Sequence, residues 1–153
     1  INILLKCKEM TELKDLKFGL YSENTVLNNL EKFFDCDLIK TSKYCSWDFE
    51  NKTKDLIIEL KTRRNTKNLY PTTMIGMNKI NKFRKMIKDI PQTKIILAFK
   101  FTDGLYYFNL NETSITDIGL NLRGGRNDRT NDEYIDDGYA FIPVKLLQEV
   151  IYK

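Results

Sequence analysis

The chain has 153 residues, enough for one compact domain with a hydrophobic core and too few for two domains of ordinary size. Apolar residues make up 42% and charged residues 30%, a composition typical of a globular protein and not of a disordered one. The absence of histidine excludes hydrolases with an imidazole base and zinc hydrolases with histidine ligands, and a net charge of +4 suits a polyanionic partner without requiring one.

The N-terminal region predicts a helix and no membrane segment. The opening "INILLKCKEM" lacks the order of a secretory signal, and no segment approaches the ~18 apolar residues of a membrane-spanning helix. Ser22 is a candidate N-cap, and apolar residues recur after it at helical spacing: Val26, Leu27, Leu30, Phe33 and Phe34.

Cysteine usage indicates a reducing environment. The chain has three cysteines, so they cannot all pair with one another, and their spacing matches neither a CxxC motif nor a metal site: Cys7, Cys36 and Cys45. We therefore expect free thiols and an intracellular protein.

Three strands follow the predicted helix. "LIKTS" (38–42) and "CSWDFE" (45–50) are short and strand-like, and "NKTK" (51–54) forms a polar turn into the strongly β-favouring "DLIIELKT" (55–62). These segments predict a hairpin.

A second helix and a buried strand come next. After Pro71, the stretch 72–90 places Ile80, Phe83 and Ile87 on one helical face, and Pro91 ends it. "TKIILAFKF" (93–101) has the apolar density of a strand that is covered on both faces.

The last third of the chain predicts a hairpin, a polar excursion and a closing unit. Asp103-Gly104 turns the chain into "LYYFNL", whereas residues 111–138 are rich in turn formers and opposite charges. "YAFIPVKLLQEVIYK" (139–153) predicts a short strand and a C-terminal helix. The whole chain, 1–153, is expected to be a single α/β domain.

The predicted hairpin can bring acids together. Side chains alternate along a strand, so Glu59 and Lys61 share a face. If the turn has an even number of residues, Asp48 lies opposite Ile57 or directly opposite Glu59, and both registers place the two carboxylates on one face. Two such carboxylates suit a hard cation such as Mg²⁺, and a lysine beside them can stabilise charge during phosphodiester hydrolysis.

Asp48, a gap of ten residues and Glu59-Leu60-Lys61 resemble the motif of the PD-(D/E)XK nuclease superfamily. Acid-x-Lys occurs four times in the chain, but only this copy follows an apolar β run with an acid at hairpin distance upstream. Trp47 stands where the family name has proline. The resemblance implies a mixed central sheet flanked by helices, with a restriction-endonuclease-like α-β-β-β-α-β core over about residues 20–101 and the C-terminal strand and helix as additions.

The same resemblance implies roles for individual residues. Asp48, Glu59 and Lys61 would be catalytic, with Mg²⁺ or Mn²⁺ held by the two carboxylates, the backbone carbonyl of Leu60 and an acid of the first helix. Glu23 is the better match for that acid and Glu31 the second.

Positive charge then predicts the partner. From Lys61 to Lys88 the chain carries basic residues and no acid. Of these, Arg63, Arg64, Lys67 and Lys79 are expected to contact nucleic acid. The resemblance adds Tyr70 and also supports Lys79, because some family members use a polar or basic residue from the helix after the motif. A DNA endonuclease is therefore predicted, and similarity to small resolvase-like members allows a homodimer.

Three alternatives stay open at this point. Asp48, Glu59 and Lys61 could form cross-strand ion pairs on a solvated face. The domain could bind nucleic acid while cleaving it weakly or not at all. It could also be a structural or protein-interaction domain without a nucleic-acid role.

Overall fold

The computed structural model describes residues 23–112, 119–121 and 138–151. A helix covers residues 23–34, and a second helix, α2, covers Met77–Asp89. Short 3-10 helices are η1 (Lys67–Leu69), η2 (Leu110–Glu112) and η5 (Val144–Leu146). The strands are β1 (Leu38–Lys40), β2 (Phe49–Asn51), β3 (Leu56–Thr62), β4 (Thr72–Gly76), β5 (Lys94–Phe101), β6 (Gly104–Asn109), β7 (Gly119–Asn121), β8 (Tyr139–Pro143) and β9 (Gln148–Glu149).

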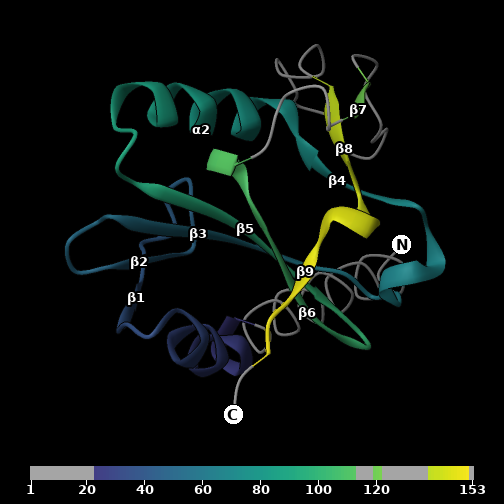
Figure 1. Ribbon diagram of the computed structural model, residues 1–153, viewed down its shortest axis with the longest axis horizontal. Helices are drawn as coiled ribbons and strands as arrows, with labels where there is room; N and C mark the ends of the chain where they lie inside the picture. Colours follow the sequence, from purple (N-terminus) through teal and green to yellow (C-terminus); the bar gives the residue numbers. More distant parts are fainter. Residues whose placement is uncertain (1–22, 113–118, 122–137, 152–153) are drawn as a thin grey trace, which may run out of the picture.

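A mixed six-stranded sheet forms the centre of the fold, in the order β1-β2-β3-β5-β6-β9 (Figure 1). Strands β3 and β5 are parallel and are joined through β4 and α2, whereas the other neighbouring pairs are antiparallel. A small second sheet has the order β4-β8-β7. The predicted α/β class and the α-β-β-β-α-β order are confirmed, with β4 inserted before α2.

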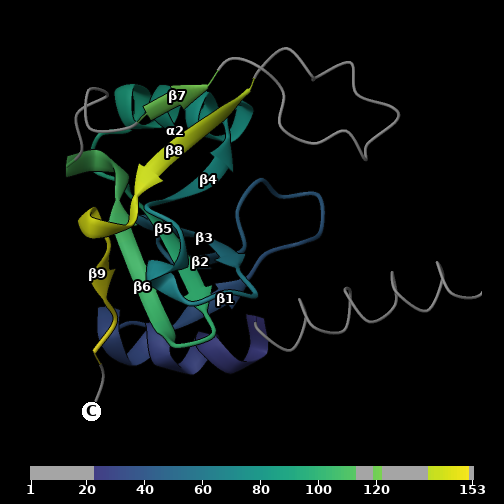
Figure 2. The same cartoon turned by 90° about the vertical axis from the view of Figure 1, so that its right-hand side faces the viewer.

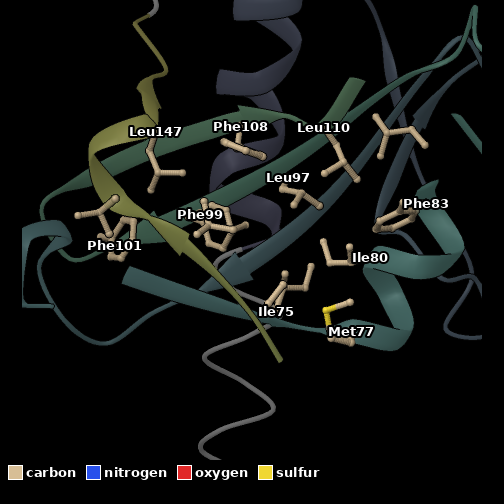
Figure 3. Close-up of a cluster of buried hydrophobic side chains, with 14 residues drawn as sticks. Ile75, Met77, Ile80, Phe83, Leu97, Phe99, Phe101, Phe108, Leu110 and Leu147 are labelled. Carbon is tan, nitrogen blue, oxygen red and sulfur yellow. The ribbon is translucent and has the colours of Figure 1, made fainter. Parts of the chain in front are cut away.

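Two hydrophobic clusters lie on opposite faces of the central sheet. The helix over 23–34 covers one face through Val26 and Leu30, while α2 and the small sheet cover the other, as Figure 2 shows. Residues of β5 alternate between the two clusters, with Leu97 and Phe99 in the second one (Figure 3). Strand β5 is therefore buried on both faces, as predicted, and its neighbour β3 is held in the middle of the domain.

The hairpin of β2 and β3 has the parity that brings acids together. Phe49 pairs with Ile58 and Glu50 with Ile57. Continued by one residue, this register places Asp48 directly opposite Glu59, which is one of the two expected registers. The other, with Asp48 opposite Ile57, is not the one observed. The turn lies one residue later than "NKTK" because Asn51 organises it. Its backbone carbonyl accepts from the Lys54 N–H at 3.0 Å, and its side-chain oxygen accepts from the Leu56 N–H at 3.1 Å.

Two predicted elements were wrong in detail. Thr72–Gly76, expected as the start of the second helix, is strand β4, because Thr73 and Ile75 are buried at a period of two and the segment pairs with β8. In place of the C-terminal helix, η5 leads into strand β9, which pairs with β6. The spacing of three between Val144, Leu147 and Val150 is typical of a helix, yet the short η5 followed by extended chain places Val144 and Leu147 in one cluster and Val150 in the other.

Some expectations lie outside the described residues, namely the Ser22 N-cap, Cys7 and most of the polar stretch 111–138. Cys36 and Cys45 are free thiols. Within the described ranges, neither helix has both the length and the apolar content needed to cross a membrane.

Candidate metal centre

Glu59 occupies the centre of β3, where its side chain is only 2% exposed. The flanking apolar and β-branched residues fix this segment as a strand, and its register sets Glu59 beside Leu97 of β5. Glu59 therefore lies on the face that α2 covers. A carboxylate buried this deeply needs cationic or hydrogen-bonding partners, because burial without them is strongly unfavourable.

The partners of Glu59 are distributed unevenly between its two oxygens. Oε1 lies 2.8 Å from the Lys61 Nζ and 2.7 Å from the Lys79 Nζ. Oε2 is buried and has no hydrogen-bond partner among the residues that the structure describes. An unsatisfied buried acceptor costs about 1–3 kcal/mol, and more when it is charged. One oxygen of this carboxylate is thus available to a ligand that prefers anionic oxygen, such as a divalent cation.

Asp48 joins Glu59 from the position immediately before β2. Its backbone N–H donates to the Ile58 carbonyl at 3.0 Å, and its carboxylate accepts from the Leu60 N–H at 2.7 Å. Burial, and then the charge of Glu59, raises the pKa of Asp48 to about 6, although the Leu60 N–H and Lys61 oppose this rise. Two carboxylates are therefore held close together at a place where added positive charge is favourable.

The raised pKa of Asp48 predicts how stability changes with pH. Between pH 3.8 and about 6 the folded protein retains a proton on Asp48 that the unfolded chain has lost. Raising the pH across this window therefore favours unfolding, and the effect levels off above pH 6. We expect the stability of wild-type protein, relative to Asp48→Asn, to fall from pH 4 to pH 6 in metal-free denaturant titrations. A difference that stays constant across the window would contradict the shift.

Lys79 reaches this site from α2. Besides Glu59, its Nζ donates to the backbone carbonyl of Ser46 at 2.6 Å, and the Lys82 Nζ donates to the Ser46 hydroxyl. Helix α2 is thereby tied both to β3 and to the segment that leads into Asp48. Lys79 was expected as a nucleic-acid contact, whereas Ser46 was missed, since nothing in the sequence relates residues 33 positions apart.

The two acids of the first helix differ in their surroundings. Glu23 pairs with Lys40 at 2.7 Å, and its charge contributes to the raised pKa of Asp48. Glu31 accepts from the Leu38 N–H at 3.0 Å and so joins the helix to β1. Among the described residues, no group of three or more Asp, Glu, Cys or His side chains could hold a metal ion. Asp48 and Glu59 therefore act as a pair of carboxylates and not as part of a larger acidic cluster among these residues.

The predicted nucleic-acid contacts have diverse environments. Arg63 donates from Nε to the Thr73 hydroxyl at 3.3 Å and from Nη2 to the Met74 carbonyl at 2.5 Å, so its guanidinium joins the two sheets. The Lys67 Nζ lies 5.0 Å from the centre of the Tyr106 ring. Arg64 and Tyr70 are exposed. The structure brings Lys79 to the carboxylates and leaves Arg64, Lys67 and Tyr70 on the segment beyond β3.

Comparison with known proteins identifies a family for this chain. The sequence matches the family described as "Phage putative PDDEXK endonuclease" over residues 17–150. No curated protein matches it. One similar solved structure is Hjc, a Holliday junction resolvase from the archaeal hyperthermophile Archaeoglobus fulgidus. It is 11% identical with a TM-score of 0.49, covering 83% of this chain and 94% of that chain.

The family match includes both helices, the β2–β3 hairpin and the strands up to β9. Asp48 and Glu59-Leu60-Lys61, whose resemblance to the family motif is evident in the sequence, meet in the fold at one end of that hairpin. The chain therefore belongs to the PD-(D/E)XK endonuclease family.

Proposed function

We propose that this protein is a metal-dependent endonuclease that hydrolyses DNA phosphodiester bonds, with Mg²⁺ or Mn²⁺ as its cofactor. The observation that carries the proposal is the Oε2 of Glu59, which is buried without a hydrogen-bond partner in the described part of the chain and lies beside a second carboxylate, Asp48. A surface ion-pair network does not explain this arrangement, because Glu59 is 2% exposed.

The donor set fits a hard divalent cation. Asp48 and Glu59 would hold it, together with the backbone carbonyl of Leu60, and Glu23 is a further candidate because its charge also acts on Asp48. Oxygen donors are the ligands that Mg²⁺ and Mn²⁺ prefer. When bound, the ion would polarise a phosphoryl oxygen and lower the pKa of a water molecule.

Lys61 supports the reaction from the protein side. Its side chain is 31% exposed, so the ammonium can contact both Glu59 and a substrate that arrives from solvent. A lysine in this place can orient the attacking water and stabilise negative charge that develops on the phosphate. With no histidine in the chain, carboxylates and lysines are the groups available for this work.

DNA is the proposed partner because positive charge continues from the site. The acid-free run from Lys61 to Lys88 includes η1, β4 and most of α2. Phosphate contacts by such residues supply most non-specific affinity for DNA. A homodimer and an intracellular location are part of the same proposal.

A cleavage panel tests the proposed activity. The protein is incubated with intact duplex, gapped duplex, branched DNA and single strands, each in Mg²⁺, Mn²⁺, Ca²⁺ or EDTA. We expect cleavage in Mg²⁺ and Mn²⁺ and none in EDTA. DNA binding without cleavage under every condition would favour an inactive DNA-binding module, and absence of both would indicate a different role.

The salt dependence of DNA binding tests the basic residues. Arg64→Gln or Lys67→Gln should weaken binding almost equally for all sequences and reduce the slope of log affinity against log salt by about one. Lys52→Gln, an exposed change in the β2–β3 turn, is the matched control. Wild-type slopes in the Arg64 and Lys67 variants would show that these side chains belong to a solvated face.

A further inference from the structure

The loop between β1 and β2, residues 41–48, presents one aromatic side chain to solvent. Tyr44 is 86% exposed, the highest value among the large exposed hydrophobic residues that the structure describes. The Lys43 Nζ lies 4.9 Å from the centre of its ring. Figure 2 shows the loop, in blue, projecting from the sheet between β1 and β2. A ring exposed to this extent buries little of its area within the fold, so its face is available to a partner.

The base of the same loop is firmly held. The Thr41 N–H donates to the Asp48 carbonyl at 2.9 Å, and the Cys45 N–H donates to the Ser42 carbonyl at 3.0 Å. Lys79 and Lys82 donate to the carbonyl and hydroxyl of Ser46.

Trp47 adds packing to these hydrogen bonds. Its Nε1 donates to Glu50 at 2.9 Å, and its ring packs against the cluster under α2. The loop is therefore anchored on both sides of Tyr44. A ring presented from an anchored loop loses less conformational freedom when it binds.

We infer that Tyr44 stacks on an unpaired base next to the phosphate that is cleaved, so that the preferred substrate is DNA with an interrupted or branched duplex. This inference rests on the proposed function, because it takes Asp48 as the place of the reacting phosphate. Asp48 follows Tyr44 by four positions, a chain length that spans at most ~14 Å. At ~3.4 Å per nucleotide along a strand, Tyr44 reaches bases within about four nucleotides of that phosphate.

The chemistry around Tyr44 favours a nucleic-acid base over a protein partner. Lys43 and Lys82 place positive charge along the loop and its anchor, which suits a phosphate backbone. A single aromatic ring flanked by cations is a base-stacking arrangement, whereas a protein interface needs a larger apolar patch. Bases within an intact duplex already stack on each other, so a side chain can stack only on a base that is unpaired or at an end.

Fluorescence of 2-aminopurine tests this inference. The base analogue is placed at successive unpaired positions of the strand opposite a five-nucleotide gap, and also within intact duplex, with Ca²⁺ or EDTA present to prevent cleavage. We expect wild-type protein and Tyr44→Phe to quench the analogue at unpaired positions. Tyr44→Leu, which keeps an apolar side chain but no ring face, and Tyr44→Ala should not quench it.

Affinity provides the second readout. The ratio of affinity for gapped over intact duplex should fall about tenfold in Tyr44→Ala and Tyr44→Leu and stay near wild type in Tyr44→Phe. Equal ratios in all four proteins would overturn the stacking inference, as would equal quenching. If wild-type protein shows the Tyr44-dependent ratio but cuts no DNA, the proposed activity fails, and with it the place of the base beside a cleaved phosphate, whereas base stacking by Tyr44 stands. If it cuts DNA and the ratio is unchanged, only the stacking inference fails.

Discussion

Glu59→Gln is expected to abolish Mg²⁺-dependent cleavage and to weaken Mn²⁺ binding by more than about tenfold, while the protein stays folded. Mutation of residues that only hydrogen-bond to a metal ligand commonly weakens metal binding 10–100-fold. Loss of a ligand itself should have at least this effect. The amide keeps an oxygen that can accept from Lys61 and Lys79 in place of Oε1, which limits the loss of stability. Glu59→Ala would instead leave two lysines facing an empty buried space, a more disruptive change.

Three measurements on the same protein decide this prediction. Calorimetric titration with Mn²⁺ gives metal affinity, single-turnover assays give the cleavage rate, and thermal unfolding in EDTA gives stability. Asp48→Asn should behave like Glu59→Gln, whereas Glu149→Gln, on the exposed strand β9, serves as the matched control. Unchanged Mn²⁺ affinity in both site variants, with folding intact, would remove Asp48 and Glu59 from the metal site.

The core of the fold could be predicted because local sequence and burial agree there. The apolar density of 93–101 predicts a strand covered on both faces, and β5 contributes alternating residues to both hydrophobic clusters. Parity of side chains in the hairpin predicts that Asp48 and Glu59 share a face, whichever even turn is used. The structure selects the register that continues to a direct Asp48–Glu59 pairing.

The differences arise where distant segments decide local structure. Thr72–Gly76 becomes a strand because Tyr139–Pro143 pairs with it across about seventy residues of chain. The connection of Lys79 to both Glu59 and Ser46 likewise depends on how α2 packs over the sheet. A lysine at helical spacing in a basic run gives no sign of which carboxylate it will meet, so its contact with Glu59 could not be read from the sequence.

Lys61 and Lys79 contact the same oxygen of Glu59, so single mutations can distinguish what each lysine contributes to the site. In Lys61→Ala, Lys79 still neutralises the buried Oε1, so we expect a smaller loss of stability than when a buried carboxylate loses its last partner. In Lys79→Ala, Lys61 takes over that pairing, but the link from α2 to the Ser46 carbonyl is lost. The second variant should therefore disturb the position of the loop that leads to Asp48.

Lys61→Ala should lower the cleavage rate by ~10²-fold or more while keeping the binding of metal and DNA, because a group that stabilises developing charge acts mainly in the transition state. Lys79→Ala is the comparison, since it removes the same charge from the same oxygen. It should weaken Mn²⁺ binding through Asp48, a change that Lys61→Ala does not produce. Single-turnover cleavage in Mg²⁺, measured beside DNA binding in Ca²⁺, separates the two effects. A Lys61→Ala protein that cuts DNA at the wild-type rate would show that Lys61 only balances the charge of Glu59, a role that Lys79 can fill alone.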